Sequence, residues 1–204
     1  MDDSQDLRSG DPTGDPTQGG TAFAPWVLPM VQKSDFTKAF VDRILAHLSQ
    51  LDESRAEGPG FNKVTRLEHC LQTATLAHQA GEDEEYVVCC LIHDIGDLLA
   101  PFNHGEFAAA LLEPFISEKN YWLVANHHSF QGYYYFEHIG LDKNMRDKFR
   151  GHPHFDDAIR FCDTYDMPAF NPDMTYMSLE DLEPMVRRLL LAPKKSIWIP
   201  HPPS

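Results

Sequence analysis

The sequence predicts an all-α protein with one folded domain. Apolar side chains recur every three or four residues along most of the chain, which is the spacing of one face of an α-helix. Ser, Thr, Asp and Asn precede several of these stretches, and Gly or Pro follows them, as at helix ends. Strand patterns are scarce. A chain of 204 residues is long enough for one domain with a sizeable core.

Composition limits the classes of partner. The net charge of −14 makes nucleic acid an unfavourable partner, because binding it requires a basic face. No apolar run reaches membrane-spanning length and no signal peptide is recognisable, so we expect no membrane association and a cytoplasmic protein. The four cysteines lack the spacing of a disulfide framework or of a CxxC zinc site. The oligomeric state stays open.

The two ends of the chain differ from its middle. Residues 1–22 are almost free of apolar side chains, and such a segment is expected to be disordered because it cannot offset its ordering entropy. Residues 23–192 carry the helical patterns and are expected to form the domain. Residues 193–204 are rich in proline and are expected to form an extended tail.

The first two expected helices begin at good capping residues. Ser34 is expected to cap a helix that ends near Leu51 and has an apolar face of Phe36, Phe40, Ile44, Leu45 and Leu48. Thr65 is expected to cap the second helix, which carries His69 near its apolar stripe. Gly81 is expected to end that helix.

The next two helices surround a proline. The third is expected to run from about Asp83 to Leu99 and to stop at Pro101. Asn103 is expected to cap the fourth, which begins with His104.

Three further helices complete the domain. One is expected to start near Ser117 and to reach His127 and His128. Another leads to Asp166 through the apolar residues Ile159, Phe161, Cys162 and Tyr165. A last helix, ending near residue 191, is expected to begin at a capping box made by Ser178 and Asp181.

The stretch from Cys89 to Asp97 is the strongest functional signal. It places His93 and Asp94 in an apolar run that leaves almost no solvated face. A buried histidine and carboxylate must be paired or bound to a ligand, because an unpaired buried charge is too costly. A core histidine that is hydrogen-bonded to its neighbours is the alternative interpretation.

Other potential ligands lie on separate expected helices. They are His69 before the pair, and His104, His127, His128, Asp163 and Asp166 after it. Four imidazoles and two carboxylates from such a set would suit two metal ions with positions left open for a substrate or oxygen.

This order of residues resembles the HD-domain superfamily of metal enzymes, from about Thr65 to Asp166. The six-ligand form resembles its binuclear members, most of all the diiron oxygenase branch that includes myo-inositol oxygenase and organophosphonate-cleaving oxygenases. The resemblance implies an HD-domain helical bundle around a binuclear metal site. The implied metal ligands are His69, His93, Asp94, His104, His127 and Asp166.

Two ligand positions have close competitors. His127 and His128 point about 100° apart on a helix, so one metal would not bind both. The block that follows them, 130–132, resembles relatives in which the ligand lies four residues before the Gln, which favours His127. An aromatic residue directly before Asp166 resembles the oxygenase branch, whereas the hydrolytic branch would favour Asp163.

Residues one helical turn from the ligands are expected to face the substrate. These are Asp97, Gln131 and Asp163, with His128 as a further neighbour of the site. None of the three turn-spaced residues is basic, which predicts an acidic pocket that favours an ammonium group or hydroxyls on the substrate. The alternative is that the carboxylates only anchor ligand histidines.

The resemblance implies an oxygenase with two irons, one ferrous and one ferric, that uses O₂ as co-substrate. It would cleave a C–P or C–C bond next to a hydroxyl-bearing carbon of a small polar molecule, such as an amine-bearing hydroxyphosphonate. Mn, Co and Zn are alternative metals because they accept the same ligands. A phosphohydrolase is the alternative activity, with a basic residue such as Arg66, Arg160 or Lys63 at the phosphoryl group. A metal-binding protein without catalytic activity is the third possible function.

Overall fold

The computed structural model describes residues 35–54 and 63–195, and it confirms the all-α fold. No β-strand occurs within these two ranges. The α-helices are α2 (Asp35–Gln50), α3 (Arg66–Gln79), α4 (Glu84–Ile92), α5 (His104–Leu112), α6 (Glu118–Tyr135), α7 (Phe155–Phe161) and α8 (Leu179–Leu190). Short helical turns are η1 (Leu51–Glu53), η2 (Phe136–Ile139), η3 (Met145–Phe149), η4 (Cys162–Asp166) and η5 (Met167–Ala169).

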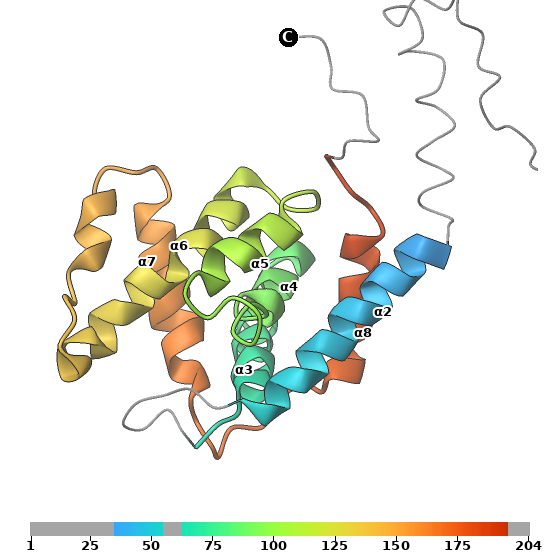
Figure 1. Cartoon of the computed structure of the whole chain (residues 1–204), viewed down its shortest axis with the longest axis horizontal. Helices are drawn as coiled ribbons and strands as arrows, with labels where there is room; N and C mark the ends of the chain where they lie inside the picture. Colours follow the sequence, from blue (N-terminus) through green and yellow to red (C-terminus); the bar gives the residue numbers. More distant parts are fainter. Residues whose placement is uncertain (1–34, 55–62, 196–204) are drawn as a thin grey trace, which may run out of the picture.

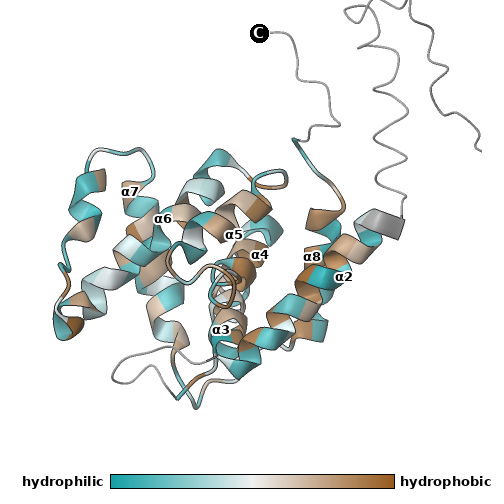
Figure 2. Cartoon of the chain, viewed as in Figure 1, coloured by the Kyte–Doolittle hydropathy of each residue, from teal (hydrophilic) through white to brown (hydrophobic). Residues whose placement is uncertain are grey.

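The helices surround a central pair. α3 and α4 pack together in the middle, with α2 and α8 side by side on one flank and α6 and α7 on the other (Figure 1). α5 packs along α6. α4 is among the most apolar segments, and hydrophilic residues lie on the outer helices (Figure 2). The core therefore forms around α4, which leads directly into His93 and Asp94.

Three helix starts have the predicted side-chain caps, whereas Asn103 precedes α5 without a capping hydrogen bond from its side chain. Thr65 and Ser178 each form a capping box, at the start of α3 and of α8. The side chain of Ser117 accepts a hydrogen bond from the first turn of α6. Gly81 has a φ of 79°, so it ends α3 in a left-handed conformation that favours glycine. Ser34 lies outside the described residues.

The prediction for the third helix was wrong at its C-terminal end. α4 stops at Ile92, and the chain continues through tight turns to Asn103. Most backbone hydrogen bonds in this segment join residues three positions apart, as from Asp97 N to Asp94 O at 3.0 Å. Gly96 explains the departure, because a Cβ on it would lie 2.8 Å from the Cα of His104. The turn brings the start of α5 against the end of α4.

The chain also departs from α-helical geometry before Asp166. α7 ends at Phe161 and passes into a single π-helical turn, η4. Such turns occur often at functional sites. The predicted helix is therefore present, but its last turn is wider than expected.

The ends of the chain leave two predictions without a test. Residues 1–34 and 196–204, which include the expected disordered segment and most of the tail, lie outside the described residues. Lys194 and Lys195 donate backbone hydrogen bonds to Pro114 O. Within the described part of the chain, no helix combines the length and apolar character needed to cross a membrane.

Candidate metal centre

Five segments bring the six predicted ligands to one buried point. His69 lies on α3, His93 and Asp94 follow α4, His104 begins α5, His127 lies on α6, and Asp166 ends η4. The Nε2 atom of His69 is 3.1 Å from Asp166 Oδ1, and that of His93 is 3.7 Å from the same oxygen. Three overlapping groups in this region have donor atoms close enough to hold a cation.

Asp94 lies between two pairs of histidines. Its Oδ2 atom is 3.5 Å from the Nε2 atoms of both His69 and His93. Its Oδ1 atom is 3.1 Å from His127 Nε2 and 3.4 Å from His104 Nε2. One carboxylate therefore faces both halves of the cluster, as a carboxylate that bridges two cations would.

The histidines present lone pairs to the centre. Nδ1 of three of them lies near a backbone carbonyl oxygen: His69 to Ala169 at 3.1 Å, His93 to Cys90 at 2.8 Å and His127 to Val124 at 2.7 Å. A carbonyl only accepts, so Nδ1 is the donor, and in a neutral ring Nε2 keeps its lone pair.

These inward nitrogens lie very close together. The two Nε2 atoms are 3.1 Å apart in the pair His69–His93 and 3.2 Å apart in the pair His104–His127. Facing lone pairs repel unless a cation or a proton lies between them. Carboxylate and imidazole donors in this arrangement fit Fe, Mn, Co or Zn.

The electrostatics favour charged forms despite burial. Burial alone lowers the pKa of His93, but Asp94 and Asp166 outweigh it and raise this pKa to about 9. Burial alone raises the pKa of both carboxyls, but the imidazoles around them, together with Arg66 beside Asp94, hold each pKa well below its usual range.

The side chains distinguish the competing residues. His127 is buried and points at Asp94, whereas His128 is half-buried and outside the three groups of donors. Burial and the neighbouring His127 lower the pKa of His128 to about 4. Asp166 is fully buried, while Asp163 is exposed.

The expectation that Asp163 faces the metals is therefore wrong. A π-turn holds more residues than an α-turn, so the residue three positions before Asp166 rotates away from it. Cys162, four positions before, takes that place instead, with its Sγ 3.8 Å from Asp166 Oδ2.

The pocket expected to be acidic around Asp97 also contains a basic residue, Arg66. Arg66 forms an ion pair with Asp97, and its Nη1 donates to Asp94 Oδ2 at 3.0 Å. Asp97 Oδ1 is 3.5 Å from His104 Nδ1, so this carboxylate also orients a ligand histidine. Arg66 precedes His69 by three residues, a helical spacing that could have identified it from the sequence.

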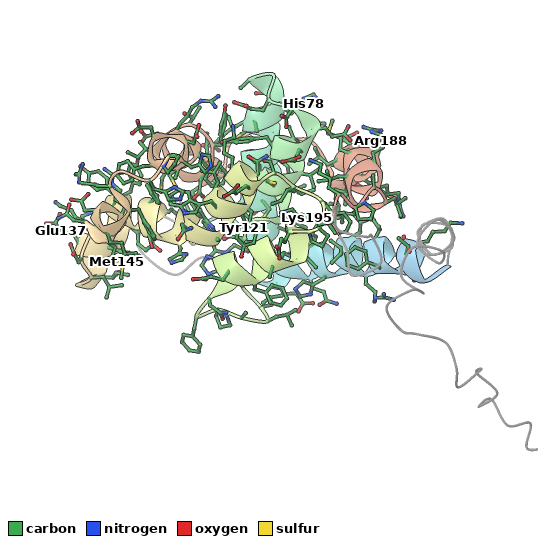
Figure 3. All side chains as sticks on the ribbon, turned by 90° about the horizontal axis from the view of Figure 1, so that it is seen from above. His78, Tyr121, Glu137, Met145, Arg188 and Lys195 are labelled. Carbon is green, nitrogen blue, oxygen red and sulfur yellow. The ribbon has the colours of Figure 1, made fainter. Side chains whose placement is uncertain are left out.

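Gln131 is buried and supports a ligand carboxylate. Its Nε2 atom donates to Asp166 Oδ1 at 2.7 Å. It therefore orients Asp166. Such anchoring was the alternative function expected for the residues one turn from the predicted ligands. Two further histidines lie away from the cluster: His78 is at the outer end of α3 (Figure 3), and His152 stacks on Trp122 at 4.0 Å.

Comparisons with known proteins agree with this geometry. Residues 66–159 match the HD domain family, a segment that includes His69, His93, Asp94, His104 and His127 but not Asp166. Over 97 residues, the chain is 32% identical to the 1-hydroxy-2-(trimethylamino)ethyl phosphonate dioxygenase (glycine-betaine-forming) of Leisingera caerulea. That alignment covers 42% of this chain and 50% of the relative, so the chain spans about half the length of the relative. The HD-domain resemblance is confirmed.

Proposed function

We propose that this HD-domain protein is an oxygenase with two iron ions in the described cluster. The observation that carries the proposal is the position of Asp94, whose two oxygens face different pairs of histidines. His69, His93 and Asp166 would hold one ion. His104 and His127, whose Nε2 atoms are 3.2 Å apart, would hold the other, and Asp94 would serve both.

The reaction we propose is cleavage of a C–P bond next to a hydroxyl-bearing carbon. Bound iron supplies the activation of O₂, while the protein supplies geometry and exclusion of water. The similar dioxygenase from Leisingera caerulea is named for a 1-hydroxyphosphonate, which supports a substrate of this class. C–C cleavage of a polyol, as the resemblance to myo-inositol oxygenase implies, is the alternative within the same chemistry.

The chain's own side chains hold the site in one arrangement. Backbone carbonyl oxygens fix the ring orientation of three histidines, and Asp97 fixes that of His104. Gln131 fixes Asp166. His69, His93 and Asp166 are fully buried, so water is excluded from that half of the cluster. Substrate must approach from the half that includes His104, which is 21% exposed.

Steady-state O₂ uptake tests the proposal. Iron-loaded protein is assayed with hydroxyphosphonates, hydroxylated amines and polyols, and phosphate is measured in the same samples. We expect O₂ uptake with a hydroxyphosphonate, and none in a His93→Ala variant. Phosphate release from simple nucleotides without O₂ uptake would contradict the proposal.

A metal-dependent phosphohydrolase is the second candidate, and one observation favours it. Arg66 places a guanidinium beside the cluster, where it would steady a phosphoryl group. The other two basic candidates make no such contact with the cluster: Arg160 is bound to Glu82 and Tyr165, and Lys63 is exposed. Hydrolysis of phosphate esters under nitrogen, at the rate seen in air, would identify this activity.

A further inference from the structure

The cluster opens to solvent on one side. His104, Arg66 and Asp97 have side chains that are 21%, 16% and 13% exposed, whereas the remaining members are almost completely buried. Burial, followed by the charge of Asp94, raises the pKa of Tyr135 to about 12. A ligand that reaches the cluster from this side therefore meets His104, Asp97 and the guanidinium of Arg66.

Arg66 is held firmly in this position. It is the first residue of α3, directly after the capping box of Thr65. Its Nη1 donates a hydrogen bond to Asp94, and its Nε forms an ion pair with Asp97 but makes no hydrogen bond. A guanidinium has five N–H donors in a planar fork, so two such partners leave part of the fork for another acceptor.

We propose that Arg66 binds the phosphonate group of the substrate. This inference rests on the proposed function and names the residue that recognises the anionic end of its substrate. A planar guanidinium matches a phosphonate with two parallel hydrogen bonds, which an ammonium group cannot do. Arg66 also reaches Asp94, so a phosphonate bound on the open side of the cluster lies next to it.

The charge balance requires bound metal for this interaction. Without metal, Asp94, Asp97 and Asp166 carry three negative charges against the positive charges of Arg66 and His93, so the site as a whole would repel an anion. Two metal ions reverse the sign of the site. Asp97 then competes with the phosphonate for the guanidinium, so removing its charge should strengthen binding of the anion.

Calorimetric titration with methylphosphonate tests the inference. The protein is loaded with manganese in place of iron, so that binding is measured apart from the oxygen chemistry. We expect Arg66→Gln to weaken binding about tenfold or more while both metal ions remain. Arg66→Lys should weaken it less, because it keeps the charge and loses the fork. Asp97→Asn should strengthen it. The matched control is Arg188→Gln. Arg188 is an exposed residue of α8 (Figure 3) that pairs with Glu84, and its substitution should leave binding of methylphosphonate unchanged.

Metal content decides between recognition of the anion and mere positioning of Asp94. If Arg66→Gln keeps its metals and binds methylphosphonate as the wild type does, the inference is wrong. If Arg66→Gln loses metal, the test depends on Arg66→Lys and Asp97→Asn. Wild-type affinity for methylphosphonate in both of these variants, with metal bound, would also show that the inference is wrong. O₂ uptake by the iron-loaded wild type is measured separately. If the wild type takes up no O₂ but binds methylphosphonate through Arg66, the oxygenase proposal is wrong and this inference still holds.

Discussion

Asp94 is the residue on which the cluster depends. It is 2% exposed and faces four imidazoles and one guanidinium. Without its charge, the imidazole groups lose the only carboxylate within the described residues that approaches both pairs. Such a buried charge is stable because each of its oxygens has charged or hydrogen-bonding partners.

We therefore expect Asp94→Asn to lose most of its bound metal. The substitution keeps the shape of the side chain and removes the charge. Metal content of the purified variant is the measurement, with circular dichroism to establish that the helices persist. A variant that is folded and retains full metal content would show that Asp94 is not a ligand.

His127→Ala should lower metal affinity much more than His128→Ala. His127 Nε2 lies 3.1 Å from Asp94 Oδ1, whereas His128 is outside the groups of converging donors. We expect a loss of about tenfold or more for His127→Ala and a small change for its neighbour. Competition with a chelator measures both affinities under the same conditions. The reverse order would transfer the ligand assignment to His128.

Metal affinity should rise with pH up to about pH 9. In the metal-free protein the pKa of His93 is raised from 6.5 to about 9, so below that pH the ring holds a proton that a metal must displace. The expected slope is about tenfold per pH unit for one released proton. Chelator competition between pH 6.5 and 8.5 measures it, and an affinity independent of pH would contradict the proton competition.

Residue order and residue type were enough to predict much of the site, whereas the rest depends on side-chain directions that the sequence does not show. The apolar stretch around His93, the order of the other candidate ligands and the resemblance to the HD-domain superfamily together selected six residues that the structure brings together. Arg66 was considered only as a partner for a phosphoryl group, and its contact with Asp94 was missed because its long side chain reaches that residue from another helix. Asp163 was misplaced because a π-turn leaves no clear mark in the sequence.

At the scale of elements, the turn between α4 and α5 fixes the geometry of the centre. Gly96 lies against the backbone of His104, with no room for a Cβ. This contact brings two ligand-bearing segments together, the end of α4 with His93 and the start of α5 with His104.

Gly96→Ala should separate these segments. We expect a loss of about 1–3 kcal/mol of stability from the overpacking, together with weaker metal binding because His104 moves. Gly151→Ala is the matched control, since its positive φ of 88° is strained for alanine but no atom lies near the new methyl group. It should lower stability without changing metal content. Equal metal content in both variants would contradict the importance of this turn.

Helix starts were easier to predict than helix ends. A cap such as Thr65 or Ser178 acts through its own side chain on the next three residues, so it is visible in the sequence. The end of α4 depends instead on a tertiary contact with a residue eight positions later, His104. Apolar periodicity continues through Leu98 and Leu99, which are nevertheless 41% and 62% exposed.

At the scale of the whole molecule, the fold brings five separate segments around one group of converging donors. α3, the turn after α4, α5, α6 and η4 each contribute at least one of the six proposed ligands. Metal binding should therefore stabilise the tertiary structure, because the ions would link elements that are up to 97 positions apart, from His69 to Asp166.

Metal analysis combined with electron paramagnetic resonance tests the central claim most directly. The protein is isolated under low oxygen, and iron is quantified before partial oxidation. Two coupled irons in one site predict two equivalents of iron per chain and the signal of a spin-coupled mixed-valent pair. One equivalent of metal, or two irons with no coupled signal at any stage of oxidation, would contradict a diiron centre held by these six residues.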